Sequence, residues 1–168
     1  MQCTPFEPVA RFHGTLDITA LGGAGFASQR ATRDEAWDLR GHDGVEVVVV
    51  AADGTFVLAS LHAIRVGPVA TAAAAAAKTN ERVTAAKRYT LTLKDELLPP
   101  DPATGREQST VSYEYDFVAH VGKMRHPRVR RIRVPWASFT ATYRGKENKD
   151  APPLDLERVR RLSLMMRR

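Results

Sequence analysis

The feature that most constrains this chain is an alternation of apolar and polar side chains, with a period of two, in several short segments. Over 111–117 the odd positions hold valine or aromatic residues and the even positions hold serine or acids. Similar alternation occurs over 12–18, over 89–93 and within 128–136. Because successive side chains of a β-strand point to opposite faces, each segment predicts a strand with one buried face. Short strands separated by turns predict an all-β, antiparallel sandwich or barrel.

The strongest single strand is predicted over 45–51, which is a near-continuous run of β-branched residues. Such a run packs on both faces or lies centrally in a sandwich. Weaker strands are expected over 25–30 and 159–166. The polar segment 32–42 and the proline-rich segment 98–106 are expected to be loops, since proline cannot donate a hydrogen bond to a sheet.

Residues 55–87 do not fit this pattern. Asp53-Gly54 follows the strongest strand and is typical of a tight hairpin turn, yet the next convincing strand is predicted only at Tyr89. The intervening segment contains an uninterrupted alanine run over 72–77 and has no clear period. We therefore expect an irregular or partly helical insertion, foreign in composition to the rest of the domain.

The length of 168 residues predicts one domain, over 1–168, with a real hydrophobic core. No apolar segment approaches the roughly 18 residues that a membrane-spanning helix needs, so no transmembrane segment is expected. The single cysteine excludes an internal disulfide. No mitochondrial presequence is readable over 1–12, which holds Glu7 and two prolines against the single Arg11.

The net charge of +6 is unevenly distributed along the chain. Residues 1–120 carry 11 positive and 15 negative side chains and residues 121–168 carry 14 and 4, so the two parts stand at −4 and +10. A basic block of this kind can mark a nucleic-acid surface. However, Arg131 and Arg133 alternate with apolar neighbours, which favours a solvated strand face, and no nucleic-acid motif accompanies them. We expect no nucleic-acid partner.

Candidate catalytic residues are few. Glu114 and Asp116 lie two apart on one predicted strand face and could pair as acid and base, with Asp95 and Glu96 nearby. Paired carboxylates on an exposed strand more often serve solvation, and the five histidines lack the close spacing of a metal site. We expect no enzyme activity, no metal and no cofactor.

Trp136, Tyr143 and Arg144 are the candidate partner-binding residues. They lie where a loop should leave the strand that ends near Pro135, and loops carry ligands in many β-sandwiches. Their residue types are also enriched at binding hot spots. The alternative is structural: Trp136 and Phe139 belong to the core, and Arg144 pairs with an acid such as Asp150.

Seven short phrases follow one another along the chain. They are Phe12-His-Gly-Thr-Leu16, Gly25-Phe-Ala-Ser-Gln-Arg30, Trp37-Asp-Leu39, Asp43-Gly-Val-Glu46, Val134-Pro-Trp136, Tyr143-Arg-Gly145 and Asp150-Ala-Pro-Pro-Leu-Asp155 leading to Leu162-Ser-Leu-Met-Met166. This set and order resemble the complex I intermediate-associated protein 30 family. The resemblance implies a jelly-roll sandwich like that of galactose-binding domains. It also implies a non-catalytic, chaperone-like module that binds partly built respiratory complex I in mitochondria, with the cytoplasm as the alternative location. A carbohydrate or small-ligand module is the alternative function, because this architecture permits it.

The same resemblance implies an incomplete domain. Family members have a further strand before the first phrase and another after the last, and they join Asp53-Gly54 almost directly to the strand at Tyr89. We therefore interpret 55–87 as an insertion, such as a translated intron, in a truncated jelly roll. Missing strands leave open sheet edges, so such a chain is expected to fold poorly alone.

Overall fold

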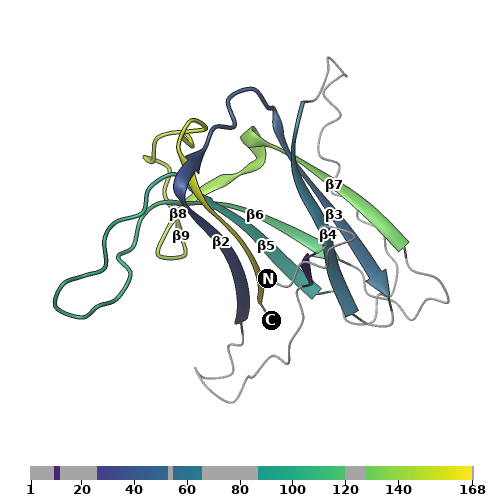
Figure 1. The fold of residues 1–168 in the computed structure, drawn as a ribbon, viewed down its shortest axis with the longest axis horizontal. Helices are drawn as coiled ribbons and strands as arrows, with labels where there is room; N and C mark the ends of the chain where they lie inside the picture. The colour runs from purple at the N-terminus through teal and green to yellow at the C-terminus, as the bar shows by residue number, and fades with distance from the viewer. Residues whose placement is uncertain (1–9, 12–25, 53–54, 66–86, 120–127, 168) are drawn as a thin grey trace.

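The computed structural model describes residues 10–11, 26–52, 55–65, 87–119 and 128–167, which form two antiparallel β-sheets (Figure 1). This confirms the predicted all-β, antiparallel sandwich. The strands are β1 (Ala10–Arg11), β2 (Phe26–Trp37), β3 (Gly44–Ala52), β4 (Thr55–Ile64), β5 (Lys87–Lys94), β6 (Ser112–Ala119), β7 (Arg128–Pro135), β8 (Thr140–Tyr143), β9 (Lys146–Glu147) and β10 (Val159–Arg167), with a 3-10 turn, η2, at Trp136–Ser138. The jelly-roll connection pattern stays a prediction.

One sheet has four described strands in the order β1-β4-β3-β7, and the other has six in the order β2-β10-β5-β6-β8-β9. The predicted strong strand is β3, and its position between β4 and β7 confirms that it lies inside its sheet. The predicted strands at 89–93, 111–117, 128–136 and 159–166 correspond to β5, β6, β7 and β10.

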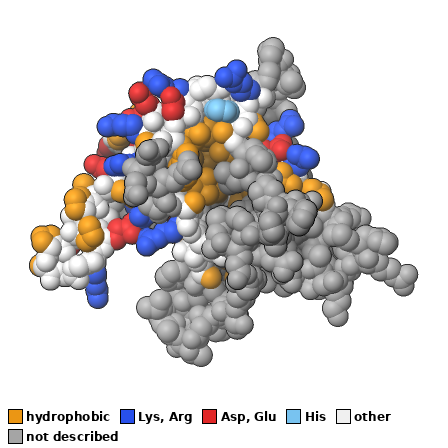
Figure 2. Space-filling model, viewed as in Figure 1, with side chains coloured by type: hydrophobic (Ala, Val, Ile, Leu, Met, Phe, Trp, Pro, Cys, Tyr) orange, Lys and Arg blue, Asp and Glu red, His pale blue; other side chains and the backbone are white. Residues whose placement is uncertain are grey.

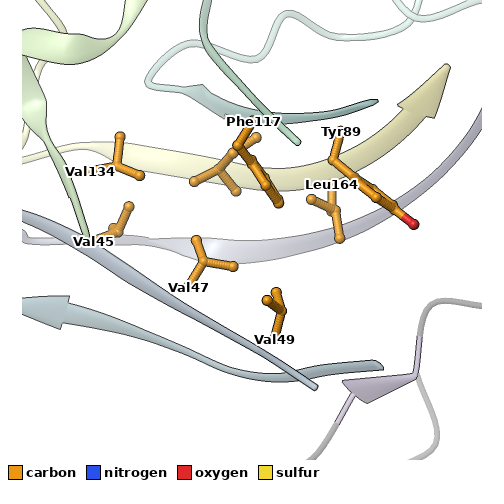
Figure 3. Close-up of a cluster of buried hydrophobic side chains, with 8 residues drawn as sticks. Val45, Val47, Val49, Tyr89, Phe117, Val134 and Leu164 are labelled. Atoms are coloured by element: carbon orange, nitrogen blue, oxygen red, sulfur yellow. The ribbon is translucent and has the colours of Figure 1, made fainter. Parts of the chain in front are cut away.

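The core lies between the two sheets, where alternate residues of their strands meet (Figure 3). Its buried members are Val45, Val47, Val49, Tyr89, Leu91, Phe117, Val134 and Leu164. The rings of Tyr89 and Phe117 are stacked, with centroids 5.7 Å apart. On the face drawn in Figure 2, hydrophobic side chains gather near the middle and charged side chains lie toward the margins. The period-two patterns therefore predicted the buried faces of these strands correctly.

The expected irregular or helical segment over 55–87 is wrong for residues 55–64, which form β4. This strand pairs with β3 from Ala52↔Thr55 to Gly44↔Ile64, so the two strands form a hairpin around residues 53–54. An irregularity in register between Val48 and Val49 explains why β4 was missed. Alternate residues of β3, from 45 to 51, pair with residues 63, 61, 58 and 56 of β4. The step between 58 and 61 is three residues instead of two, so β4 does not keep a strict period of two.

The expected loop over 32–42 is wrong for residues 32–37, since β2 continues to Trp37. These residues pair with β10, and β2 is the last described strand at its edge of the six-stranded sheet. An edge strand can carry a polar sequence, because its conformation is fixed by its neighbour rather than by its own pattern. The predicted strand over 12–18 and the alanine run at 72–77 lie outside the described residues.

Candidate binding surface

Trp136 is held where β7 ends and turn η2 begins. Its indole Nε1 donates a hydrogen bond of 2.6 Å to the carbonyl oxygen of His42, and its backbone N–H donates one of 3.1 Å to the carbonyl oxygen of Asp43. The ring of Phe139 lies nearby, with its centroid 6.2 Å from that of Trp136. Both rings are partly buried and pack against the core, so the indole is fixed in position.

Gly44 makes this arrangement possible. A Cβ atom at this position would lie 2.3 Å from the carbonyl oxygen of Val134, which is closer than any carbon can approach. Glycine therefore lets the start of β3 lie against the end of β7. This explains in physical terms why glycine stands at position 44, where β3 begins.

Tyr143 and Arg144 lie at the tip of the β8–β9 hairpin. Tyr143 pairs with Lys146, leaving Arg144 and Gly145 as a two-residue turn with φ angles of 50° and 76°. Two positive φ angles are typical of a type I′ turn, which favours glycine at the second position. The guanidinium of Arg144 lies 5.4 Å from the centroid of the Tyr143 ring, whose residue is 41% exposed. Among the described ion pairs, none joins Arg144 to Asp150.

A groove of about 570 Å³ runs beside this hairpin. Its apolar lining is Tyr113, Trp136, Phe139, Ala141, Leu154 and Leu156, and its polar rim includes Glu147, Asn148 and Lys149. The hydroxyl of Tyr113 donates a 2.9 Å hydrogen bond to the carbonyl oxygen of Pro152, which ties the proline-containing loop to the sheet. Burial, together with the charge of Asp95, raises the pKa of Tyr113 to about 12, so this hydroxyl keeps its proton at neutral pH.

The structure divides the predicted trio between two places. Trp136 lines the groove, whereas Tyr143 and Arg144 are exposed on the adjoining hairpin. The packing of Trp136 and Phe139 against the core agrees with the structural alternative, although both also face the groove. A role of the trio in binding stays a prediction.

The acids singled out by the sequence do not form one cluster. Asp116 accepts a 2.6 Å hydrogen bond from the hydroxyl of Thr90, and Asp95 accepts one of 2.9 Å from the backbone N–H of Asp155. In the described ranges, no three histidine, cysteine or acidic side chains gather as a metal site would require. No described helix is long and apolar enough to span a membrane.

Sequence reasoning missed the role of Glu46. Its carboxylate lies on the outer face of β3 and accepts hydrogen bonds from Arg131 Nη1 at 2.8 Å and Arg133 Nε at 3.0 Å. These two hydrogen bonds lower the pKa of Glu46 against the opposing effect of burial. The signal was present as an acid inside a β-branched run and two arginines at a spacing of two. The two arginines are exposed, which confirms the solvated strand face predicted for them.

Comparisons with known proteins confirm the family resemblance noted above. The family model described as complex I intermediate-associated protein 30 matches residues 74–168, which is more than half of the chain. An uncharacterized protein of Schizosaccharomyces pombe is 30% identical over 159 residues, covering 94% of this chain and 55% of the relative. The chain thus spans about half the length of that relative. No solved structure matches.

Proposed function

Because this chain belongs to the complex I intermediate-associated protein 30 family, we propose that it is a non-catalytic module that binds protein partners during the assembly of mitochondrial respiratory complex I. The family's association with complex I assembly supports this role and a mitochondrial location. Chaperone-like binding of incompletely assembled subunits is the finer form of the proposal. A cytoplasmic location is its alternative.

The observation that carries this proposal is the groove beside the β8–β9 hairpin. Its floor is aromatic and aliphatic, and its rim is polar, as at the centre and edge of many protein interfaces. The indole of Trp136 is fixed by its hydrogen bond to His42, so little side-chain freedom is lost when a partner binds. The groove therefore suits an apolar side chain of a partner protein.

The hairpin adds a second contact region. The I′ turn fixes the backbone of Arg144, and the cation–π contact with Tyr143 orients both side chains toward one another before binding. Tyrosine and arginine are among the residues that contribute most at interfaces. We place the polar part of the partner contact at this tip.

The absence of catalysis is part of the proposal. Of the candidate acids, Asp116 and Asp95 accept hydrogen bonds that tie neighbouring segments together. Such bonds suit a structural role for these acids, which supports a module without catalysis.

The proposal is tested in cells that lack the gene, by following complex I and its intermediates on native gels. The wild-type chain should restore mature complex I and co-purify with an intermediate. A variant with Tyr143→Thr and Arg144→Asn keeps strand and turn preferences but removes the ring and the charge. We expect about tenfold less co-purified intermediate, because a hot-spot pair contributes about 1.4 kcal/mol or more.

The matched control is Val129→Thr. Val129 is an apolar residue that is 62% exposed, and it lies on β7 in the other sheet, away from the hairpin. It should rescue like the wild type. Unchanged complex I after deletion of the gene would contradict the assembly role, whereas equal rescue by both variants would contradict the placement of the contact.

A small-ligand module is the second candidate, and the size of the groove favours it. A volume of about 570 Å³ lies within the usual range of roughly 300–1,000 Å³ for small-molecule sites. A carbohydrate site usually presents exposed aromatic rings, whereas Tyr113, which lines the groove, is only 4% exposed. Titration with simple sugars, followed by the intrinsic fluorescence of Trp37 and Trp136 together, tests this candidate.

A further inference from the structure

Three cations lie on neighbouring strands of the outer face of the six-stranded sheet. Arg30 is on β2, Arg161 is on β10 and Lys94 is on β5, and β10 runs between the other two. Arg161 and Lys94 are direct register partners. Like charges placed directly opposite one another destabilise a sheet, so this placement needs a compensating anion.

Glu107 supplies one carboxylate to this cluster. It belongs to the loop 95–111, which stands out from the sheets between β5 and β6 (Figure 1). Its Oε2 accepts a 2.8 Å hydrogen bond from Arg30 Nη1, and its Oε1 accepts one from Arg161 Nη1. One carboxylate therefore bridges two guanidinium groups.

This neutralisation is incomplete. The side chain of Arg161 is only 12% exposed, and its buried Nε has no hydrogen-bond partner in the described part of the chain. An unpaired buried donor costs free energy, and such donors are rare in folded proteins. The cluster thus contains one buried N–H donor, Arg161 Nε, that has no acceptor among the described residues.

Lys94 has a neutral hydrogen-bond partner. Its ammonium donates a 2.9 Å hydrogen bond to the hydroxyl of Thr110, which has no charge to offer. Burial lowers the pKa of Lys94, and the charge of Arg161 acts in the same direction against those of Glu107 and Glu114. Three cations thus face two carboxylates, and the cluster keeps a net positive charge.

We propose that Arg30, Lys94 and Arg161 form a binding site for the oxyanion group of a ligand, a phosphate or a carboxylate, and that Glu107 is a displaceable internal ligand of this site. Two guanidinium groups can each present a pair of N–H donors to the oxygens of such a group. The inference does not depend on the proposed assembly role, because the cluster and the groove lie on opposite faces of the sheet.

Glu107 is suited to displacement by its location. Its side chain is 40% exposed and lies on a loop whose residues 102–109 are all exposed. Moving such a loop disrupts little buried surface. In contrast, Lys94 and Arg161 lie on β5 and β10, and each of these strands is paired with a neighbouring strand on both sides. When Glu107 leaves, the Nε and Nη groups of Arg161 become available to a ligand.

The test measures binding of inorganic phosphate to the full chain by calorimetry at low ionic strength. Glu107→Gln removes the internal competitor and should tighten phosphate binding about tenfold, which corresponds to about 1.4 kcal/mol. Adding Arg161→Gln to that variant should abolish the gain. Arg106→Gln, which removes an exposed cation of the same loop, is the control and should leave the affinity unchanged. Acetate in place of phosphate distinguishes the two ligand chemistries.

A second measurement covers the case in which Glu107→Gln folds poorly. Phosphate added to the wild-type chain should increase amide exchange over 95–111 without affecting β3, because the loop is released when Glu107 is displaced. The proposal is overturned if Glu107→Gln binds phosphate no better than the wild type, if the gain survives Arg161→Gln, or if phosphate leaves exchange over 95–111 unchanged.

Discussion

The two arginine–glutamate clusters of this molecule each join one carboxylate to two guanidinium groups, but they differ in which partner is withdrawn from solvent. In the four-stranded sheet the carboxylate of Glu46 is 8% exposed, and Arg131 and Arg133 are 64% and 68% exposed. In the six-stranded sheet it is Arg161 that is buried, and the carboxylate of Glu107 belongs to an exposed loop. A buried carboxylate on an inner strand cannot exchange its partners, whereas a loop carboxylate over a buried cation can. The first cluster is therefore structural, and the second is suited to binding.

The largest expected effect separates the two clusters by stability. Glu46→Gln removes the negative charge and replaces one of the two acceptor oxygens with an NH2 group that faces an arginine donor, and at this buried position it should lower the free energy of unfolding by about 2 kcal/mol. Glu107→Gln should lower it by about 1 kcal/mol or less, because the carboxylate of Glu107 is 40% exposed and water can take its place beside Arg30 and Arg161. Urea denaturation of both variants measures the difference. Equal losses would mean that both clusters are structural.

The positions of these clusters could be predicted from sequence only in part. The period of two predicted which residues of β5 and β6 face the core, and by extension Lys94 falls on the outward face of β5, whereas for 159–166 only a weak strand was predicted, with no face assigned to Arg161. It could not predict that these two residues are register partners, since pairing between distant strands depends on the whole topology. Glu107 lies in a proline-rich loop, where sequence patterns carry no information about distance to β2 or β10.

The candidate site shows the same limit. Trp136, Tyr143 and Arg144 were singled out by residue type and by their place after a strand, and the hairpin turn follows from Arg144-Gly145. The groove could not be predicted, because it depends on where the segment 147–156 packs against β6 and β8. The hairpin of β3 and β4 was missed because one irregularity in register shifts the apolar positions by a residue.

A smaller effect is expected from pH. The hydrogen bonds from Arg133 and Arg131 hold the pKa of Glu46 below its ordinary value of 4.5. Burial acts to raise the pKa of Glu107, but hydrogen bonds and charges from Arg161 and Arg30 outweigh it and lower that pKa too. A carboxylate whose pKa is lower in the folded chain stabilises it above the ordinary pKa, and this contribution is lost as the pH falls through the folded value.

The pH effect should also differ between the clusters. Unfolding midpoints in urea, measured from pH 6 down to pH 3, should fall for the wild type. Glu46→Gln should flatten this dependence more than Glu107→Gln does, because Glu46 is only 8% exposed, whereas Glu107 is 40% exposed and water screens its interactions with the arginines. A wild-type profile that is flat below pH 4.5 would contradict the role given to both carboxylates.

The smallest expected effect comes from exchanging one exposed cation for another. Arg133→Lys keeps the charge beside Glu46 and can still donate one hydrogen bond, and Arg131 continues to hold the other carboxylate oxygen. The free energy of unfolding should therefore fall by less than about 0.5 kcal/mol.

Arg161→Lys keeps the charge as well, but an ammonium is a more strongly hydrated group than a guanidinium, and here it would be buried. It should cost more than Arg133→Lys in the same urea experiment, and the opposite order would mean that burial of the cation is not what distinguishes the two clusters.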